Sequence, residues 1–342
     1  MDSNRGEYSH LTNTKKDSLI PTPAFVEGGI VFIFLAIVLA IIVLVFGIYN
    51  WQKSRYIMPR GYGTAVETWQ QMGLEQSASR VVDGSAEHPF DVVVWGTDPE
   101  GIAAAVAAAR NGLHTLLVDH RDVVGGLFTL GRLNFIDMND YDHGRLVTRG
   151  IFEEFYTKVG GVVFDIKDGQ RVFEEMIYNE PLLVLDLNNQ LVEPVLAEDN
   201  KVTYLRVEKG GEQREVHGKI FIDASQDADL AYQAGVPFTV GFEDMGMPGH
   251  FQVSTLVFNV TGINWPRVMW ETLAVDRRRG SAATFSAAWG LDNYVRQYES
   301  ADSDIAFRGF NMARQQDGQV LLNGILIHGV DINEPATRSA AK

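Results

Sequence analysis

The stretch from Phe90 to Asp119, FDVVVWGTDPEGIAAAVAAARNGLHTLLVD, has the pattern of a strand, a helix and a second strand. Its first six residues form a short apolar run followed by a glycine, which is typical of a parallel strand buried on both faces. An alanine-rich segment then ends at Gly112, a residue common just after a helix C-terminus. Leu113 to Asp119 supplies the second strand. This order predicts a right-handed βαβ unit, and hence an α/β fold with a parallel sheet.

The turn between the first strand and the helix contains Gly96, Asp98 and Gly101. In a dinucleotide fold the first glycine permits a tight turn, the last permits close packing of helix on strand, and the helix N-terminus offers N–H groups to a phosphate. Asp98 stands at the middle position, where a carboxylate would crowd and repel that phosphate. Asp119 ends the next strand, where an acid binds the adenosine ribose. The alternative is a βα turn in which Asp98 caps the helix and no ligand binds.

A second glycine cluster, Gly125-Gly126, follows the second strand directly. Glycines at this point allow the backbone to approach a flat ligand closely, whereas the alternative interpretation is a flexible loop.

Together these segments resemble the opening of the FAD-dependent oxidoreductase family, whose members have a glutathione-reductase-type dinucleotide-binding fold. The segment Ile222 to Ala231, followed by Ala234 to Pro237, is similar to that family's second loop at the cofactor, and Leu322 to Asp331 is similar to a later family segment. The resemblance implies FAD as the cofactor. Carried over by position, it implies cofactor-binding roles for Gly96, Asp98, Gly101, Asp119, Gly125, Gly126 and Asp227.

The sequence also departs from the family pattern. Asp98 replaces a small residue, Gln226 and Ala228 replace glycines, and family members commonly continue beyond the point where this sequence ends. Two hypotheses remain open. The chain is either a membrane-anchored FAD-dependent oxidoreductase with an unidentified small-molecule substrate, or a catalytically silent relative that serves as a structural or accessory subunit of a membrane complex.

The membrane prediction rests on Ile30 to Tyr49, which are almost entirely aliphatic or aromatic, within a segment from Gly28 to Gln52 that has no charged residue. As a helix at about 1.5 Å per residue, this stretch would span roughly the 30 Å thickness of a bilayer. We therefore expect one transmembrane helix and contact with membrane lipid. Basic residues after the span favour a cytoplasmic C-terminal domain under the positive-inside rule.

The composition excludes several classes of function. The net charge of −15 would repel nucleic acid, and the absence of cysteine excludes iron–sulfur clusters, cysteine-ligated zinc and thiol nucleophiles. The histidines lack metal-binding spacing. His143, His250 and His328 are interpreted as surface or core residues, with acid–base roles as the alternative. The acidic loop with Asp137, Asp140 and Asp142 and the basic run Arg277 to Arg279 are interpreted as solvated surface, with cation and carboxylate binding as the respective alternatives.

These patterns divide the chain into a disordered tail (1–27), a transmembrane helix (28–52), a linker (53–89) and an FAD-dependent oxidoreductase-like domain (90–342). Within that domain we expect a dinucleotide-binding parallel sheet from about 90–131 and 218–241. A mixed, strand-rich second region is expected from 132–217 and 242–342, including a hairpin around Lys209 to Glu212.

Overall fold

The computed structural model describes residues 35–45, 82–141, 145–276 and 280–330. The chain divides into two compact units, Met1–Arg60 and Gly61–Lys342. In the first unit, residues 35–45 form a helix whose side chains are exposed. The rest of the predicted transmembrane helix, the tail and most of the linker lie outside the described residues. Within the described ranges, no helix combines the length and hydropathy needed to cross a membrane.

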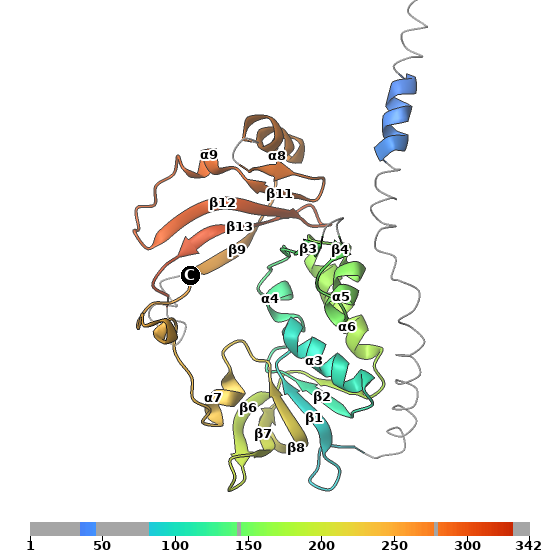
Figure 1. Cartoon of the computed structure of the whole chain (residues 1–342), viewed down its shortest axis with the longest axis vertical. Coiled ribbons are helices and arrows are strands. Elements are labelled where there is room, and N and C mark those ends of the chain that lie inside the picture. Colours follow the sequence, from blue (N-terminus) through green and yellow to red (C-terminus); the bar gives the residue numbers. More distant parts are fainter. Residues whose placement is uncertain (1–34, 46–81, 142–144, 277–279, 331–342) are drawn as a thin grey trace, which may run out of the picture. The chain divides into compact units, whose positions relative to one another are not determined.

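Six strands of the second unit form one mixed sheet (Figure 1). The strands β5, β2, β1 and the last part of β8 are parallel, whereas β8, β7 and β6 are antiparallel. This arrangement confirms the predicted α/β class. In sheet order, the strands are β5 (Leu183–Asp186), β2 (Thr115–Val118), β1 (Phe90–Trp95), β8 (Glu212–Asp223), β7 (Val202–Lys209) and β6 (Gln190–Leu196).

Both faces of β1 are buried, as its continuous apolar run predicted. Because side chains alternate along a strand, Val92 and Val94 pack on one face and Val93 and Trp95 on the other. Helices α3 (Pro99–Arg110), α5 (Ile151–Val159) and α6 (Ile166–Tyr178) contribute to the first of these cores. On the opposite face, residues of β7 and β8 complete the core, including Leu205, Val207 and Val216.

The first sheet is larger than the sequence indicated, since it draws β5, β6 and β7 from residues 132–217, which the sequence assigned to the second region. Strand β5 has only four residues and joins the parallel edge beside β2. A hydrophobic pattern indicates that a segment is a strand but does not identify its partner. The predicted hairpin is confirmed, with Lys209 paired to Glu212 between β7 and β8.

A second, antiparallel sheet has the strand order β10 (Ala282–Ala283), β11 (Ala287–Gly290), β12 (Ile305–Arg314), β13 (Val320–Ile327) and β9 (Ser254–Val260). Its core contains Trp265 of α8 (Trp265–Trp270) together with Ala288, Met312, Val320 and Leu322. The apolar run near Val320 to Val330 predicts a last strand, and β13 confirms it. The remaining elements are α4 (Gly126–Thr129), β3 (Asp140–Tyr141), β4 (Arg145–Leu146), α7 (Asp229–Gln233), η1 (Glu243–Met245), η2 (Glu271–Val275) and α9 (Asp292–Val295).

The turn between β12 and β13 contacts the start of α6. The side chain of Gln315 accepts a hydrogen bond from the backbone N–H of Ile166 at 2.9 Å, and the N–H of Gln316 donates to Asp165 at 2.8 Å. Arg132, which follows α4, donates to Asn259 of β9 at 2.7 Å. These contacts connect the second sheet to the helices of the first.

Candidate dinucleotide site

The glycines of the β1–α3 turn are required by close packing. A Cβ atom on Gly96, whose φ is +112°, would lie 2.2 Å from the carbonyl oxygen of Ala224, and one on Gly101 would lie 2.0 Å from the carbonyl oxygen of Gly96. The turn therefore sits directly against the end of β8, and α3 sits directly against the turn. These observations agree with the packing roles expected of the two glycines in a dinucleotide fold.

Asp98 occupies the N-cap position of α3, but its side chain makes no hydrogen bond to that helix. The capping bond in the alternative interpretation of this turn is therefore not formed. The side chain instead turns toward the next loop, where Oδ1 accepts from the backbone N–H of Leu127 at 2.8 Å and Oδ2 accepts from Arg121 Nη2 at 2.6 Å. Asp98 is fully buried. Its carboxylate thus joins the β1–α3 turn to the segment after β2.

Asp119 follows β2 and is 1% exposed. One carboxylate oxygen accepts from the backbone N–H and the hydroxyl of Thr97 at 2.6 and 2.7 Å, and also from Arg121 Nη2 at 2.6 Å. The other accepts from the backbone N–H of Arg121 at 2.9 Å and lies 3.2 Å from His120 Nδ1. Both oxygens are therefore engaged by protein donors.

These donors set the ionisation of the cluster. Burial by itself would raise the pKa of the Asp119 carboxyl, but hydrogen bonds from Arg121 and Thr97 outweigh that effect and lower the pKa to about 2. Burial opposes the charge of Arg121 as well, yet its bonds to Asp119 and Asp98 raise the pKa of the guanidinium. Asp119 and Arg121 are therefore both charged at neutral pH.

The glycine cluster after β2 makes room for Asp98. A Cβ on Gly126 would lie 1.5 Å from Asp98 Oδ1, and one on Gly125 would lie 2.7 Å from a methyl group of Thr129. Gly125 also donates its N–H to the carbonyl oxygen of Thr97 at 2.8 Å, so the two glycine-containing loops are directly bonded. The cluster is an ordered packing element, which contradicts the interpretation of a merely flexible loop.

The loop after β8 is held by Asp223, whose carboxylate accepts from the N–H and hydroxyl of Ser225 and from the N–H of Ala231. Ala228 has a φ of +54°, a left-handed conformation that disfavours side chains. Asp227 is exposed. Burial, followed by the charges of Asp227 and Asp223, raises the pKa of the Asp229 carboxyl.

The structure brings the predicted site residues Gly96, Asp98, Gly101, Asp119, Gly125 and Gly126 together where β1 and β2 end. Asp227 belongs to the neighbouring loop, close enough to Asp229 for their charges to interact. Sequence reasoning missed Arg121 and Thr97. The available signal for Arg121 was a basic residue two positions after a strand-ending acid, which is within reach of that acid but is also common on surfaces.

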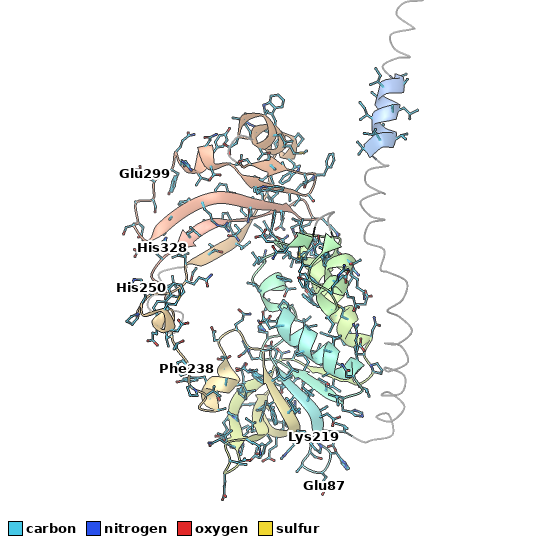
Figure 2. All side chains as sticks on the ribbon, viewed as in Figure 1. Glu87, Lys219, Phe238, His250, Glu299 and His328 are labelled. Carbon is cyan, nitrogen blue, oxygen red and sulfur yellow. The ribbon has the colours of Figure 1, made fainter. Side chains whose placement is uncertain are left out.

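The other candidate residues that the structure describes do not gather into a site. His250 and His328 are exposed, and Figure 2 shows them on different segments of the chain. The interpretation of Asp137 as a surface residue agrees with its exposure, whereas Asp142, His143 and Arg277 to Arg279 lie outside the described residues. Among the residues that the structure describes, no group of His, Asp or Glu side chains could hold a metal ion.

Comparisons with known proteins identify a family. A family model described as FAD dependent oxidoreductase matches residues 91–341. This match supports FAD as the cofactor, as the sequence predicted. No match was found among curated proteins.

Several solved structures are similar to this chain at low sequence identity. A geranylgeranyl bacteriochlorophyll reductase-like protein from Thermoplasma acidophilum is 15% identical, with 69% of this chain and 56% of that chain covered and a TM-score of 0.42. The p-nitrophenol 4-monooxygenase PnpA from Pseudomonas putida is 11% identical over 73% and 60% of the two chains, with a TM-score of 0.37. The myxobacterial chondrochloren halogenase CndH is 15% identical over 74% and 56%, with a TM-score of 0.39. This chain spans about three fifths of the length of these proteins.

Proposed function

Because the chain belongs to the family of FAD dependent oxidoreductases, we propose that it is a membrane-anchored member that binds FAD and exchanges electrons with a small-molecule substrate. The observation that carries this proposal is the position of Asp119. Its carboxylate stands after β2, next to a glycine turn that leads into the N-terminus of α3. In a dinucleotide fold this is the position of the acid that binds the adenosine ribose.

The backbone suits FAD. The side chain of the N-cap residue Asp98 makes no hydrogen bond to the first turn of α3, and the N–H groups at a helix N-terminus suit a phosphate. Gly96 and Gly101 keep the turn narrow, and the backbone places residue 119 where a dinucleotide fold has the acid that binds the ribose hydroxyls. When bound, FAD would supply the hydride and electron transfer, while the protein positions and shields it.

The side chains, in the arrangement described here, do not suit FAD. The Asp98 carboxylate occupies the donors of Leu127 and Arg121, and Asp119 is already saturated by Thr97 and Arg121. A diphosphate placed beside Asp98 would meet a buried negative charge. We therefore derive no catalytic step through the cofactor, and we propose that binding requires these side chains to rearrange.

Absorbance spectroscopy tests the proposal. The full-length chain purified in detergent should show a flavin spectrum, either as isolated or after incubation with FAD and removal of the excess. Heat-released flavin, quantified against protein, should approach one per chain. A colourless preparation that takes up no added FAD would exclude a flavin enzyme.

Membrane anchoring is a separate part of the proposal. It is supported by the uncharged stretch from Gly28 to Gln52, of which residues 35–45 are described as a helix. We propose that this stretch spans the bilayer in contact with lipid and that the basic residues after it place the second unit in the cytoplasm. Alkaline carbonate should leave the full-length chain in the membrane pellet, whereas detergent should release it. Release by carbonate alone would contradict the anchor.

A second candidate function is favoured by the buried Asp98 carboxylate. A chain that fills its own cofactor site with a side chain could keep the fold as a scaffold and act as an accessory subunit of a membrane complex. This candidate predicts a folded, colourless protein that copurifies with other membrane subunits. The flavin measurement separates it from the first candidate.

A further inference from the structure

We propose that Asp98 is an internal competitor of the cofactor diphosphate, and that Arg121 exchanges the Asp98 carboxylate for the diphosphate when FAD enters. This inference rests on the proposed function, since it concerns the same site. Its first support is that the Asp98 carboxylate is held by the same kinds of donor that would hold a bound anion. The carboxylate is fully buried, and its oxygens accept hydrogen bonds from a backbone N–H and a guanidinium.

The donors used by Asp98 are also the donors that suit a phosphate. A guanidinium binds phosphate oxygens and carboxylate oxygens with the same fork of N–H groups. A backbone N–H beside glycines can likewise approach an anion closely, and Leu127 follows Gly125-Gly126 directly. A diphosphate that replaced the Asp98 carboxylate would therefore find both donors in place.

The charges of the cluster show why both anions cannot be bound together. Arg121 is 2.6 Å from a carboxylate oxygen of Asp98 and 2.6 Å from one of Asp119, so a single cation serves two buried carboxylates. The net charge of these three side chains is already negative. A diphosphate would add further negative charge without another cation among them, unless the Asp98 carboxylate first moved toward solvent.

Gly126 provides the space that the buried Asp98 carboxylate needs. Its missing side chain creates the space for Asp98, because a Cβ there would overlap Oδ1 at 1.5 Å. The Asp98 backbone, by contrast, has φ −68° and ψ 166°, which any residue can adopt. An alanine at this position would therefore keep the turn, lose no capping bond, and expose Arg121 and the Leu127 N–H to an incoming diphosphate.

The test is a set of FAD titrations on the full-length chain in detergent, followed by the quenching of flavin fluorescence. Asp98→Ala should bind FAD about tenfold or more tightly than the wild type, because the competing charged hydrogen bond is removed. Asp98→Asn keeps the shape of the side chain and loses its charge, so its affinity for FAD should lie between those of the wild type and Asp98→Ala. This variant replaces Asp98→Ala in the test if the alanine variant does not fold. Asp122→Ala is the matched control, since it removes an exposed carboxylate from the same segment; its affinity should stay within about twofold of the wild type.

The role of Arg121 needs a double variant. Asp98→Ala with Arg121→Gln should lose most of the affinity gained by Asp98→Ala alone, because the cation that would receive the diphosphate is gone. If the double variant binds FAD as tightly as Asp98→Ala, Arg121 does not receive the diphosphate and that half of the proposal is overturned. Circular dichroism confirms that each variant is folded.

The outcomes separate this inference from the proposed function. If the wild type binds FAD and Asp98→Ala binds no more tightly, Asp98 is not a competitor and the flavin function stands. If only Asp98→Ala binds FAD, the inference is supported, and the wild type is a scaffold rather than a loaded enzyme. If folded wild type and folded Asp98→Ala both fail to bind, both proposals are overturned. If Asp122→Ala gains as much affinity for FAD as Asp98→Ala, the gain comes from general surface charge, and the inference is also overturned.

Discussion

The β1–α3 turn and the loop after β8 both depart from the family pattern that the sequence resembles, but they do so in different ways. In the turn, Asp98 is buried and bonded to two partners. In the loop, Gln226 and Ala228 are exposed, and Ala228 has a left-handed backbone that favours glycine. One departure is integrated into the surrounding structure, whereas the other is tolerated at a conformational cost.

The difference lies in what each position requires. Position 98 has an ordinary extended backbone, so a side chain there needs only space and a counter-charge, which Gly126 and Arg121 provide. Position 228 needs a positive φ, which costs a non-glycine residue about 1–2 kcal/mol and which no neighbouring side chain can relieve. A departure from a family pattern is therefore informative about function only when the backbone angles and contacts at that position are known.

The largest effect is expected from removing the shared cation. Arg121→Ala leaves two buried carboxylates without their counter-charge and should lower the free energy of unfolding by about 3–5 kcal/mol. Arg149→Ala is the control, because its ion pair with Glu153 is exposed and should be worth less than about 1 kcal/mol. Denaturant unfolding of the full chain, followed by tryptophan fluorescence, to which the buried Trp95 contributes, measures both. Equal midpoints for the two variants would contradict the importance of this cluster.

The next effect concerns the space at Gly126. Gly126→Ala places a methyl group on the Asp98 carboxylate and should destabilise the fold by about 2–3 kcal/mol. Combining it with Asp98→Ala should recover part of that loss, since the overlapping atoms are removed. The coupling free energy from this double-mutant cycle should therefore differ clearly from zero. Strict additivity would show that the strain comes from the backbone of Gly126 alone.

Two carboxylates, Asp119 after β2 and Asp229 after the β8 loop, should change the stability of the fold in opposite directions as the pH falls. The pKa of Asp119 is lowered to about 2, so its contribution of about 2 kcal/mol is present above the unfolded pKa near 4 and is lost as the pH falls toward 2. The pKa of Asp229 is raised, so its ionisation destabilises the fold as the pH rises above the unfolded value. In Asp119→Asn, the free energy of unfolding should therefore depend less on pH than in the wild type as the pH falls from about 4 to about 2. Asp229→Asn should instead gain stability near neutral pH, and a shared direction of change would contradict these environments.

The smallest effect is expected in the loop. Ala228→Gly relieves the left-handed strain but increases the freedom of the unfolded chain, so the net stabilisation should be about 0.5–1 kcal/mol. Ala234→Gly is the matched control, because Ala234 has a φ of −77° and gains nothing from glycine. In thermal unfolding, the midpoint should rise in Ala228→Gly and should not rise in Ala234→Gly. A destabilising Ala228→Gly would mean that the alanine methyl makes an important contact.

Much of the first sheet was predictable from sequence because its signals are local. The strand from Phe90 to Trp95, the helix ending at Arg110, and the hairpin around Lys209 were all recovered within a few residues. The position of Asp119 after the second strand followed from the same pattern. The identity of strand partners did not, since β5 reaches its place only after a crossover through α5 and α6.

The sequence by itself determined the α/β class, the glycine-dependent turn and the resemblance to FAD-dependent oxidoreductases, because each depends on neighbouring residues and on backbone preferences. It also identified Asp98 as a departure. Only the tertiary structure decided where that carboxylate points. Asp98, Arg121 and Leu127 meet because two parallel strands end at the same edge of one sheet, and no local pattern records such a meeting of side chains from separate segments.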